Sequence, residues 1–237
     1  MVVITGGSGF IGSYLRKQLP DAINLDIKEG KDILTCDLPR ADMIIHLAAQ
    51  PGVIASFEEP YKTFETNVMG SLRLIEHYKN SKFIFASTGG AIQNGEAKSP
   101  YGLSKLTAEK MIEMLHSDYV ILRFANIYGK GSRSVVDKFL NGDIAIYGDG
   151  SATRTYCYID DLIRGIIQSI NWPKGVYSFG SDQTYSVKEL AEATGKPIKY
   201  EDWRRGEFRS SSLSNFTPNW SPTKDVIDYI REEVCCP

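Results

Sequence analysis

The sequence predicts an α/β protein with a doubly wound parallel sheet and a small C-terminal lobe. The first twelve residues, MVVITGGSGFIG, have the pattern of a buried strand, a glycine-rich turn and the start of a helix. Strand-like and helix-like segments then alternate as far as Gly129, which is typical of a parallel sheet with helices on both faces. Beyond Gly129 the alternation loosens. We therefore expect residues 1–129 to form mainly the sheet domain, residues 143–170 to return to it, and residues 130–237 to form mainly the lobe.

The glycine-rich turn predicts a dinucleotide site. The β-branched residues 2–4 are typical of a strand buried on both faces, and a helix pattern runs from residue 10 to 19. Gly6, Gly9 and Gly12 lie between strand and helix. Without side chains there, backbone N–H groups can approach a pyrophosphate, and the helix dipole favours its negative charge.

Asp26 ends the second predicted strand, residues 22–26, and lies 20 residues after Gly6. The dinucleotide fingerprint has a carboxylate at this spacing, where it binds the ribose hydroxyls. A carboxylate would repel a 2′-phosphate, so the sequence favours NAD over NADP.

Two further strands are predicted at residues 32–37 and 43–49. The links 27–31 and 38–42 are short, whereas a parallel crossover normally needs a dozen residues or more. Either these links are bare loops that leave one face of the sheet thinly covered, or one of the strand predictions is wrong.

The remaining elements follow from apolar periodicity. Helices are expected at 57–80 and 101–116, with strands at 83–85 and 119–123. In the second half we expect helices at 134–140, 160–170, 186–194 and 223–232, strands at 143–147, 155–158 and 175–179, and a loop at 210–221.

Composition excludes several classes of partner. The net charge is −2 and no basic cluster is present, so neither nucleic acid nor an anionic membrane is expected as a partner. No apolar run approaches the ~20 residues of a membrane span, and a strand that begins at residue 2 leaves no room for a signal peptide. The four cysteines have no metal-ligand spacing. We expect a cytoplasmic protein without a metal site.

Tyr101 and Lys105 carry the second motif. Residues at i and i+4 share one helix face, and a lysine ammonium beside a phenol lowers a pKa that is otherwise about 10. Tyr101 is therefore a candidate acid/base near neutral pH. Thr88 follows a buried strand and could bridge a substrate oxygen to Tyr101.

Together these features resemble the extended short-chain dehydrogenase/reductases, which have a Rossmann-type sheet, and among them the nucleotide-sugar epimerases similar to UDP-glucose 4-epimerase. The resemblance covers nearly the whole chain. Its motifs, in family order, are TGGSGFIG at 5–12, Asp37-Leu38, HLAAQ at 46–50, TNVMGS at 66–71, STGG at 87–90, YGLSK at 101–105, LRFANIYG at 122–129, GDGSATRTYCYIDD at 148–161 and RRGE at 204–207.

The resemblance implies roles residue by residue. Tyr101 would take the proton of the sugar 4-hydroxyl, Lys105 would hold the nicotinamide ribose and polarise Tyr101, and Thr88 would bond the same oxygen. The substrate would be held by Thr88, Asn126, Arg154 and Arg204. NAD would contact Gly6, Gly9, Phe10, Ile11, Gly12, Asp26, Asp37, Leu38, Leu47, Ala48, Ala49, Gln50, Asn67, Ser87, Tyr101, Lys105, Phe124 and Ile127.

The implied activity is a 4-epimerisation of the UDP-glucose/UDP-galactose type, in which the sugar is oxidised at C4 and hydride returns to the opposite face. UDP-glucuronate epimerase, decarboxylase and keto-sugar reductase are alternatives, as is a non-catalytic NAD-binding regulatory protein. A 4,6-dehydratase is disfavoured because Gly89-Gly90 stands where that class has an Asp-Glu pair. Shortened loops after Gly90 and Gly129 leave the sugar open.

The family also implies an assembly. Its members commonly dimerise by packing two long helices into a four-helix bundle, and residues 57–80 and 101–116 would be those helices here. We therefore expect a homodimer.

Overall fold

The computed structural model describes residues 1–206 and 208–235. Glu207, which belongs to the RRGE motif, and Cys236 lie outside the described residues. The core of the fold is a six-stranded parallel sheet in the order β11-β7-β4-β3-β1-β2. Its strands are β1 (Val2–Thr5), β2 (Ile23–Leu25), β3 (Met43–His46), β4 (Lys82–Thr88), β7 (Tyr119–Phe124) and β11 (Gly175–Phe179).

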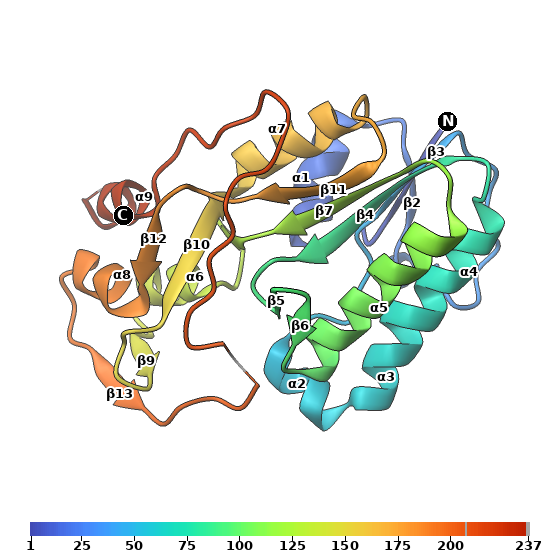
Figure 1. Ribbon diagram of the computed structural model, residues 1–237. Helices are drawn as coiled ribbons and strands as arrows, with labels where there is room; N and C mark the ends of the chain where they lie inside the picture. Colours follow the sequence, from blue (N-terminus) through green and yellow to red (C-terminus); the bar gives the residue numbers. More distant parts are fainter. Residues whose placement is uncertain (207, 236–237) are drawn as a thin grey trace.

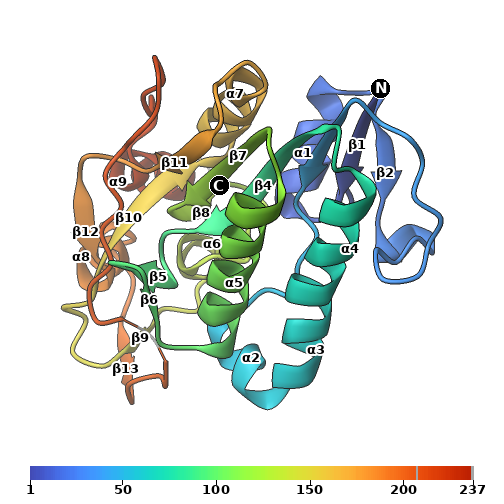
Figure 2. The same ribbon diagram turned by 45° about the vertical axis from the view of Figure 1, so that its right-hand side comes forward.

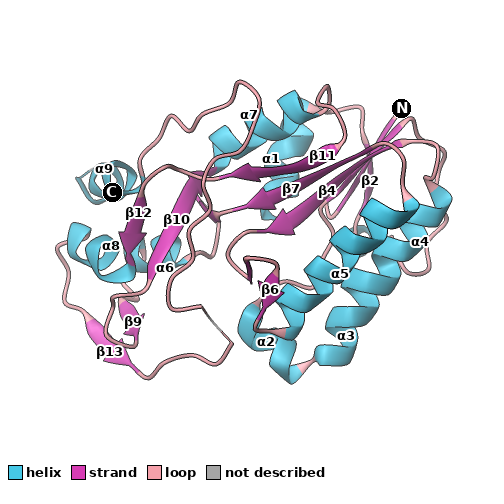
Figure 3. Ribbon diagram, in the orientation of Figure 1, coloured by secondary structure: helices cyan, strands magenta, loops and turns pink. Residues whose placement is uncertain are grey.

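Helices cover both faces of this sheet (Figure 1 and Figure 3). On one face, α1 (Phe10–Gln18) and α7 (Ile159–Ser169) pack over a core that includes Leu15 and Ile166. On the other face, α4 (Gly70–His77) and α5 (Pro100–Leu115) enclose Leu74 and Ile112. The doubly wound parallel sheet expected from the sequence is therefore confirmed.

A smaller lobe lies at the end of the molecule away from α4 (Figure 1). A three-stranded sheet contains β8 (Asn126–Tyr128), β10 (Thr153–Tyr158) and β12 (Thr184–Ser186). The lobe also contains the short pair of β9 (Ala145–Tyr147) with β13 (Lys199–Glu201), whereas the pair of β5 (Ile92–Gln93) with β6 (Glu96–Ala97) lies against α5 of the sheet domain. The lobe helices are α6 (Val135–Leu140), α8 (Val187–Ala193) and α9 (Val226–Cys235), and Val136, Leu190 and Ile230 share its core.

The predicted strand at 32–37 is wrong, and this removes the problem of the short links. The chain leaves β2, forms the 3-10 turn η1 (Ile27–Glu29), and reaches β3 through residues 30–42 without another strand. Arg73 of α4 holds the connection by donating to the carbonyl oxygens of Ile33 at 2.6 Å and Cys36 at 2.6 Å. Ile33, Cys36 and Leu38 pack into the core beside α4, so an irregular segment covers this face of the sheet.

The prediction of one continuous helix over residues 57–80 is also wrong. The chain forms α2 (Val53–Glu58), α3 (Pro60–Phe64), the π-helical turn η2 (Glu65–Met69) and α4 in succession. Pro60 explains the first break, because a residue before proline is disfavoured in the helical conformation, and Glu59 has φ −125° and ψ 60°. Figure 2 shows this broken rod running beside α5.

The loop predicted at 210–221 lies along two strand edges. Ser178 of β11 exchanges backbone hydrogen bonds with Phe216 at 3.1 and 3.0 Å, and the N–H of Ser211 donates to the carbonyl oxygen of Thr153. The loop therefore covers the open edge of the main sheet. Within the described residues, no helix is long and apolar enough to cross a membrane.

Candidate functional site

A cavity of about 510 Å³ opens at the carboxyl ends of the parallel strands. This is where open α/β sheets bind ligands, next to the point at which the strand order reverses between β1 and β3. Fourteen of the residues expected to contact NAD line it: Gly6, Gly9, Phe10, Ile11, Gly12, Asp26, Leu47, Ala48, Ala49, Gln50, Ser87, Tyr101, Lys105 and Phe124.

The glycine turn leaves backbone exposed at one wall of this cavity. Gly6 has φ +71°, a conformation that favours glycine. A Cβ atom on Gly12 would overlap the carbonyl oxygen of Gly6 and the backbone of Gly7, so the close approach of α1 to the turn requires glycine there. Residues 9–12, at the start of α1, line the cavity, and the N–H groups of the first helical turn have no partner within the helix, as an anionic ligand needs.

Asp26 lies at the opposite side of the turn and is buried. Its two carboxylate oxygens accept hydrogen bonds from the backbone N–H of Ser8 at 2.9 Å and of Lys28 at 2.9 Å. The side chain is therefore held in one orientation at the cavity wall, with lone pairs left to accept from a ligand hydroxyl.

A second cavity of about 380 Å³ lies between the sheet domain and the lobe. All of the residues expected to hold the substrate line it: Thr88, Asn126, Arg154 and Arg204. The Asn126 amide donates to the carbonyl oxygen of Thr155 at 3.1 Å, and the Arg154 guanidinium donates to those of Phe208 at 2.6 Å and Arg209 at 3.0 Å. Arg204 stacks 3.3 Å from the centre of the Tyr147 ring.

Tyr101 joins the two cavities, because among the described residues it alone lines both. It stands in the first turn of α5, where the Ser99 side chain caps the helix by accepting from the N–H of Gly102 at 3.1 Å. Thr88 at the end of β4 makes a side-chain hydrogen bond to Tyr101. A phenol hydroxyl thus stands where a ligand of one cavity would meet a ligand of the other.

The electrostatics of this pair differ from the expectation. Burial raises the pKa of Tyr101 to about 12, against a smaller lowering effect of the Thr88 hydrogen bond. Burial also lowers the pKa of Lys105 to about 7, although Glu109 opposes this. Lys105 is 3 % exposed, and its Nζ lies 4.1 Å from the centre of the Phe85 ring. The expected lowering of the Tyr101 pKa by Lys105 is therefore wrong for the protein by itself, since the removal of both groups from water dominates.

Asp37 and Leu38 do not line the larger cavity; Asp32 and Ile33 do. The reason is the turn that replaces the predicted strand. Asp32 accepts from the N–H of Leu34 at 2.9 Å, so the chain turns back at Asp32 and carries residues 37 and 38 away.

Asn67 and Ile127 also differ from their expected places. Asn67 is buried and is not in the lining: its amide bonds the backbone of Gln50 at 2.7 and 3.1 Å and the Ser104 hydroxyl at 3.0 Å. It therefore supports the cavity wall from behind. Ile127 lines the smaller cavity, because it follows β7 on the lobe side.

Sequence reasoning missed several polar groups of the site. Arg133 and Lys138 line the smaller cavity, on the loop before α6 and on α6 itself. Glu109 is fully buried behind Lys105, and its spacing of i+4 from Lys105 could have indicated it. Among residues 1–206 and 208–235, no three His, Cys, Asp or Glu side chains converge as a metal site would require.

Comparison with known proteins identifies the family. Residues 2–180 match the model of the NAD dependent epimerase/dehydratase family. A relative from Methanocaldococcus jannaschii, provisionally named a UDP-glucose 4-epimerase, is 31% identical, over 87% of this chain and 84% of its own. A UDP-glucuronate 4-epimerase from Thermodesulfobacterium geofontis is 33% identical over 81% of this chain and 71% of its own.

Solved structures agree in fold. The UDP-glucose 4-epimerase of Thermotoga maritima with UDP-glucose has a TM-score of 0.82 and 29% identity, over 98% of this chain and 97% of its own. The UDP-glucose 4-epimerase of Thermus thermophilus, in complex with NAD, has a TM-score of 0.77 and 26% identity, over 99% of this chain and 97% of its own.

The larger cavity fits NAD on its own chemistry. The backbone cradle beside Gly12 suits a pyrophosphate, and the carboxylate of Asp26 suits ribose hydroxyls. The family match covers β1 to β11, and with it the whole parallel sheet. The chain therefore belongs to the NAD dependent epimerase/dehydratase family.

Proposed function

We propose that this protein is a nucleotide-sugar 4-epimerase that uses NAD and acts on substrates of the UDP-glucose/UDP-galactose type. The observation that carries the proposal is the position of Tyr101 at the junction of a cofactor-sized and a substrate-sized cavity. The UDP-glucose 4-epimerases among the similar structures support the same reading.

The chain's own groups suit proton transfer at the sugar 4-hydroxyl. Bound NAD+ supplies a hydride acceptor and the positive charge of its nicotinamide ring. Tyr101 accepts the hydroxyl proton, and Thr88, already bonded to Tyr101, donates to the same oxygen as it becomes a carbonyl. Lys105, in its protonated form, stabilises the phenolate. When the 4-keto sugar has turned over in the cavity, hydride would return to the opposite face of C4, and Tyr101 returns the proton to the sugar oxygen.

The arginines suit the nucleotide diphosphate. Arg154 and Arg204 reach the smaller cavity from the lobe, and planar guanidinium groups bind phosphate oxygens through paired donors. We accordingly assign residues 130–237 mainly to substrate binding, apart from α7 and β11, which belong to the sheet domain. Arg133 and Lys138 add further positive charge on the same wall.

The test is turnover followed by NMR of the sugar protons. Purified protein is incubated separately with UDP-glucose, UDP-galactose, UDP-glucuronate and the N-acetyl analogues. The proposal expects interconversion of UDP-glucose and UDP-galactose without net change in NADH absorbance. Tyr101→Phe should retain NAD and lose turnover; if turnover is unchanged, Tyr101 is not the base.

A UDP-glucuronate 4-epimerase is the second candidate, favoured by the 33% identical relative that bears this name. Turnover of UDP-glucuronate alone would select it, and release of CO₂ would indicate a decarboxylase. Stoichiometric NADH consumption would indicate a reductase. If the protein holds NAD tightly but turns over none of these substrates, a non-catalytic regulatory protein would be favoured.

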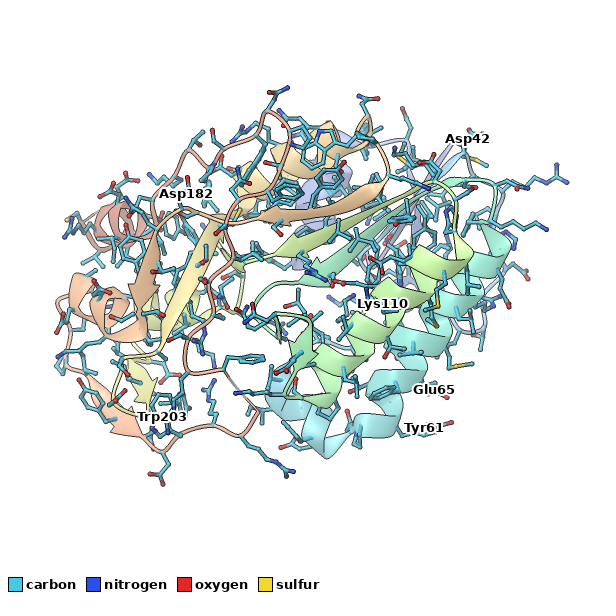
Figure 4. The ribbon with its side chains drawn as sticks, in the orientation of Figure 1. Asp42, Tyr61, Glu65, Lys110, Asp182 and Trp203 are labelled. Atoms are coloured by element: carbon cyan, nitrogen blue, oxygen red, sulfur yellow. The ribbon has the colours of Figure 1, made fainter. Side chains whose placement is uncertain are left out.

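We also propose a homodimer formed through α3, η2 and α5. These elements carry large apolar side chains that are exposed in the single chain, namely Tyr61, Met69, Leu103 and Met114. Tyr61 lies on the outer side of α3 (Figure 4). Light scattering at micromolar concentration should give twice the chain mass, and Met114→Glu should convert the dimer to monomer. A monomeric wild-type protein would refute the proposal.

A further inference from the structure

A buried chain of hydrogen bonds connects the first strand to the catalytic helix. His46 at the end of β3 is fully buried, and both of its ring nitrogens are bonded. Nδ1 lies 2.6 Å from the Thr5 hydroxyl, and Nε2 lies 3.0 Å from the Ser71 hydroxyl of α4. The ring thus joins β1, β3 and α4 beneath the larger cavity.

The neighbours of the ring decide its tautomer. The Ser71 hydroxyl donates to the carbonyl oxygen of Asn67 at 2.6 Å, so it accepts from His46 and Nε2 carries the proton. Thr5 Oγ1 accepts from the N–H of Ala48 at 3.1 Å, and among the described residues its own hydrogen has only Nδ1 as an acceptor. His46 is therefore neutral, and every bond runs in one direction from Ala48 to Asn67.

The chain has functional groups at both ends. At one end, Ala48 lines the larger cavity. At the other end, the Asn67 amide donates to the Ser104 hydroxyl at 3.0 Å, and Ser104 donates to the carbonyl oxygen of Tyr101 at 2.8 Å. The Asn67 side chain also bonds the backbone N–H and carbonyl oxygen of Gln50, a second residue of the larger cavity.

We propose that His46 is a positioning residue of the hydride-transfer site. As a neutral Nε2–H ring between Thr5 and Ser71, it sets the spacing between the cavity backbone at residues 48–50 and the first turn of α5, which carries Tyr101. The inference rests on the proposed function for its turnover readout only; its NMR and NAD-binding readouts are independent of the substrate.

The surroundings favour the neutral ring. Burial and the charge of Lys105, which faces it from α5, hold the pKa of His46 well below 6.5. From β4 the ring meets the aromatic side chains of Phe83 and Phe85, at centroid distances of 6.1 and 5.5 Å. A protonated ring would turn a second N–H toward Thr5 and remove the acceptor of the Thr5 hydroxyl hydrogen.

The first test is ¹⁵N NMR of the histidine side chains in the whole protein, assigned through correlations to the backbone. The chain has three histidines, so the spectrum is simple. The proposal expects His46 to remain the neutral Nε2–H tautomer between about pH 5 and 8. The Nδ1–H tautomer, or titration within this range, would overturn it.

The second test compares two buried helix serines. Ser71→Ala removes the acceptor of His46, whereas Ser169→Ala removes only a hydroxyl that donates to the carbonyl oxygen of Ile166 at 2.7 Å in α7. Ser71→Ala should weaken NAD binding by about tenfold, because a buried donor loses its partner, and should lower kcat with little change in KM for the nucleotide sugar. Ser169→Ala should change neither. Equal behaviour of the two variants would contradict the proposal.

A matched pair at Thr5 separates positioning from packing. Thr5→Val keeps the shape and loses the hydroxyl, and we expect the same loss of NAD affinity as for Ser71→Ala. Thr5→Ser keeps the hydroxyl and should bind NAD within about twofold of the wild type. If Thr5→Ser loses as much affinity as Thr5→Val, the hydrogen-bond chain is not what positions the cofactor wall.

Discussion

Glu109 of α5 and Arg123 of β7 form a two-bonded ion pair between this helix and the parallel sheet. Arg123 Nε lies 3.0 Å and Arg123 Nη2 lies 2.6 Å from the two carboxylate oxygens. The carboxylate is fully buried and also accepts from the hydroxyl of Ser87, a cavity residue of β4. The pair therefore ties the helix that carries Tyr101 to the two strands whose ends form the cavity.

Removal of Glu109 should destabilise the protein strongly. Glu109→Ala leaves the Arg123 guanidinium without its buried partner, and breaking a buried pair in this way lowers the free energy of unfolding by about 3 kcal/mol or more. Urea unfolding followed by circular dichroism measures the change. The control is Lys110→Ala, which breaks the exposed pair with Glu113 on the same helix and should change stability by less than about 1 kcal/mol. Similar losses in both variants would show that burial of the Glu109 pair is unimportant.

Lys105 should make stability rise with pH. Its pKa is about 7 in the folded protein and 10.5 as the ordinary value, so between these values the unfolded chain binds the extra proton and stability increases with pH. Lys105→Met removes this dependence and should stabilise the protein near pH 7 by about 2–4 kcal/mol, since one pKa unit corresponds to about 1.4 kcal/mol. Free energies of unfolding measured between pH 7 and 10.5 test whether stability rises with pH as expected. Lys62→Met, at an exposed lysine of the same cavity, should keep the wild-type pH dependence.

A side chain at Gly12 should weaken NAD binding. The Cβ atom of Gly12→Ala overlaps the Gly6 carbonyl, and only displacement of the turn relieves the overlap. We expect NAD affinity to fall by at least about tenfold, measured by calorimetry. Gly195→Ala is the contrast: its Cβ meets nothing within 4 Å, but Gly195 has φ +66°, so it should lose about 1 kcal/mol of stability and bind NAD normally. Normal NAD binding by Gly12→Ala would exclude the turn as the pyrophosphate site.

Asp26 should decide between NAD and NADP. Asp26→Asn keeps a side chain of the same size and removes the charge that repels a 2′-phosphate, so NADP affinity should rise by about tenfold relative to NAD. Asp32→Asn removes another carboxylate of the same cavity and serves as the control. An equal change in both variants would mean that the total charge of the cavity, rather than Asp26, discriminates between the cofactors.

The local sequence pattern was sufficient to predict a helix or strand where that element is long, regular and buried. The helix expected at 101–116 is α5, and the strands expected at 2–4 and 119–123 are β1 and β7, because their apolar residues face a core that the period of the sequence already indicates. The errors lie where a distant side chain or a proline overrides that period. Residues 32–37 have the composition of a strand, but Arg73, 40 residues further along from Ile33, binds the carbonyl groups that a neighbouring strand would need.

The sequence by itself determined the sheet class, the glycine turn, Asp26, and the pairing of Tyr101 with Lys105 on one helix face, because each depends on spacings within a short stretch of chain. Only the tertiary structure decided that Tyr101 lines both cavities, that Asn67 bonds Gln50 and His46 bonds Ser71, and that burial raises the pKa of Tyr101 and lowers that of Lys105. Burial and hydrogen-bond partners depend on segments far apart in the chain, and no local spacing records how those segments meet.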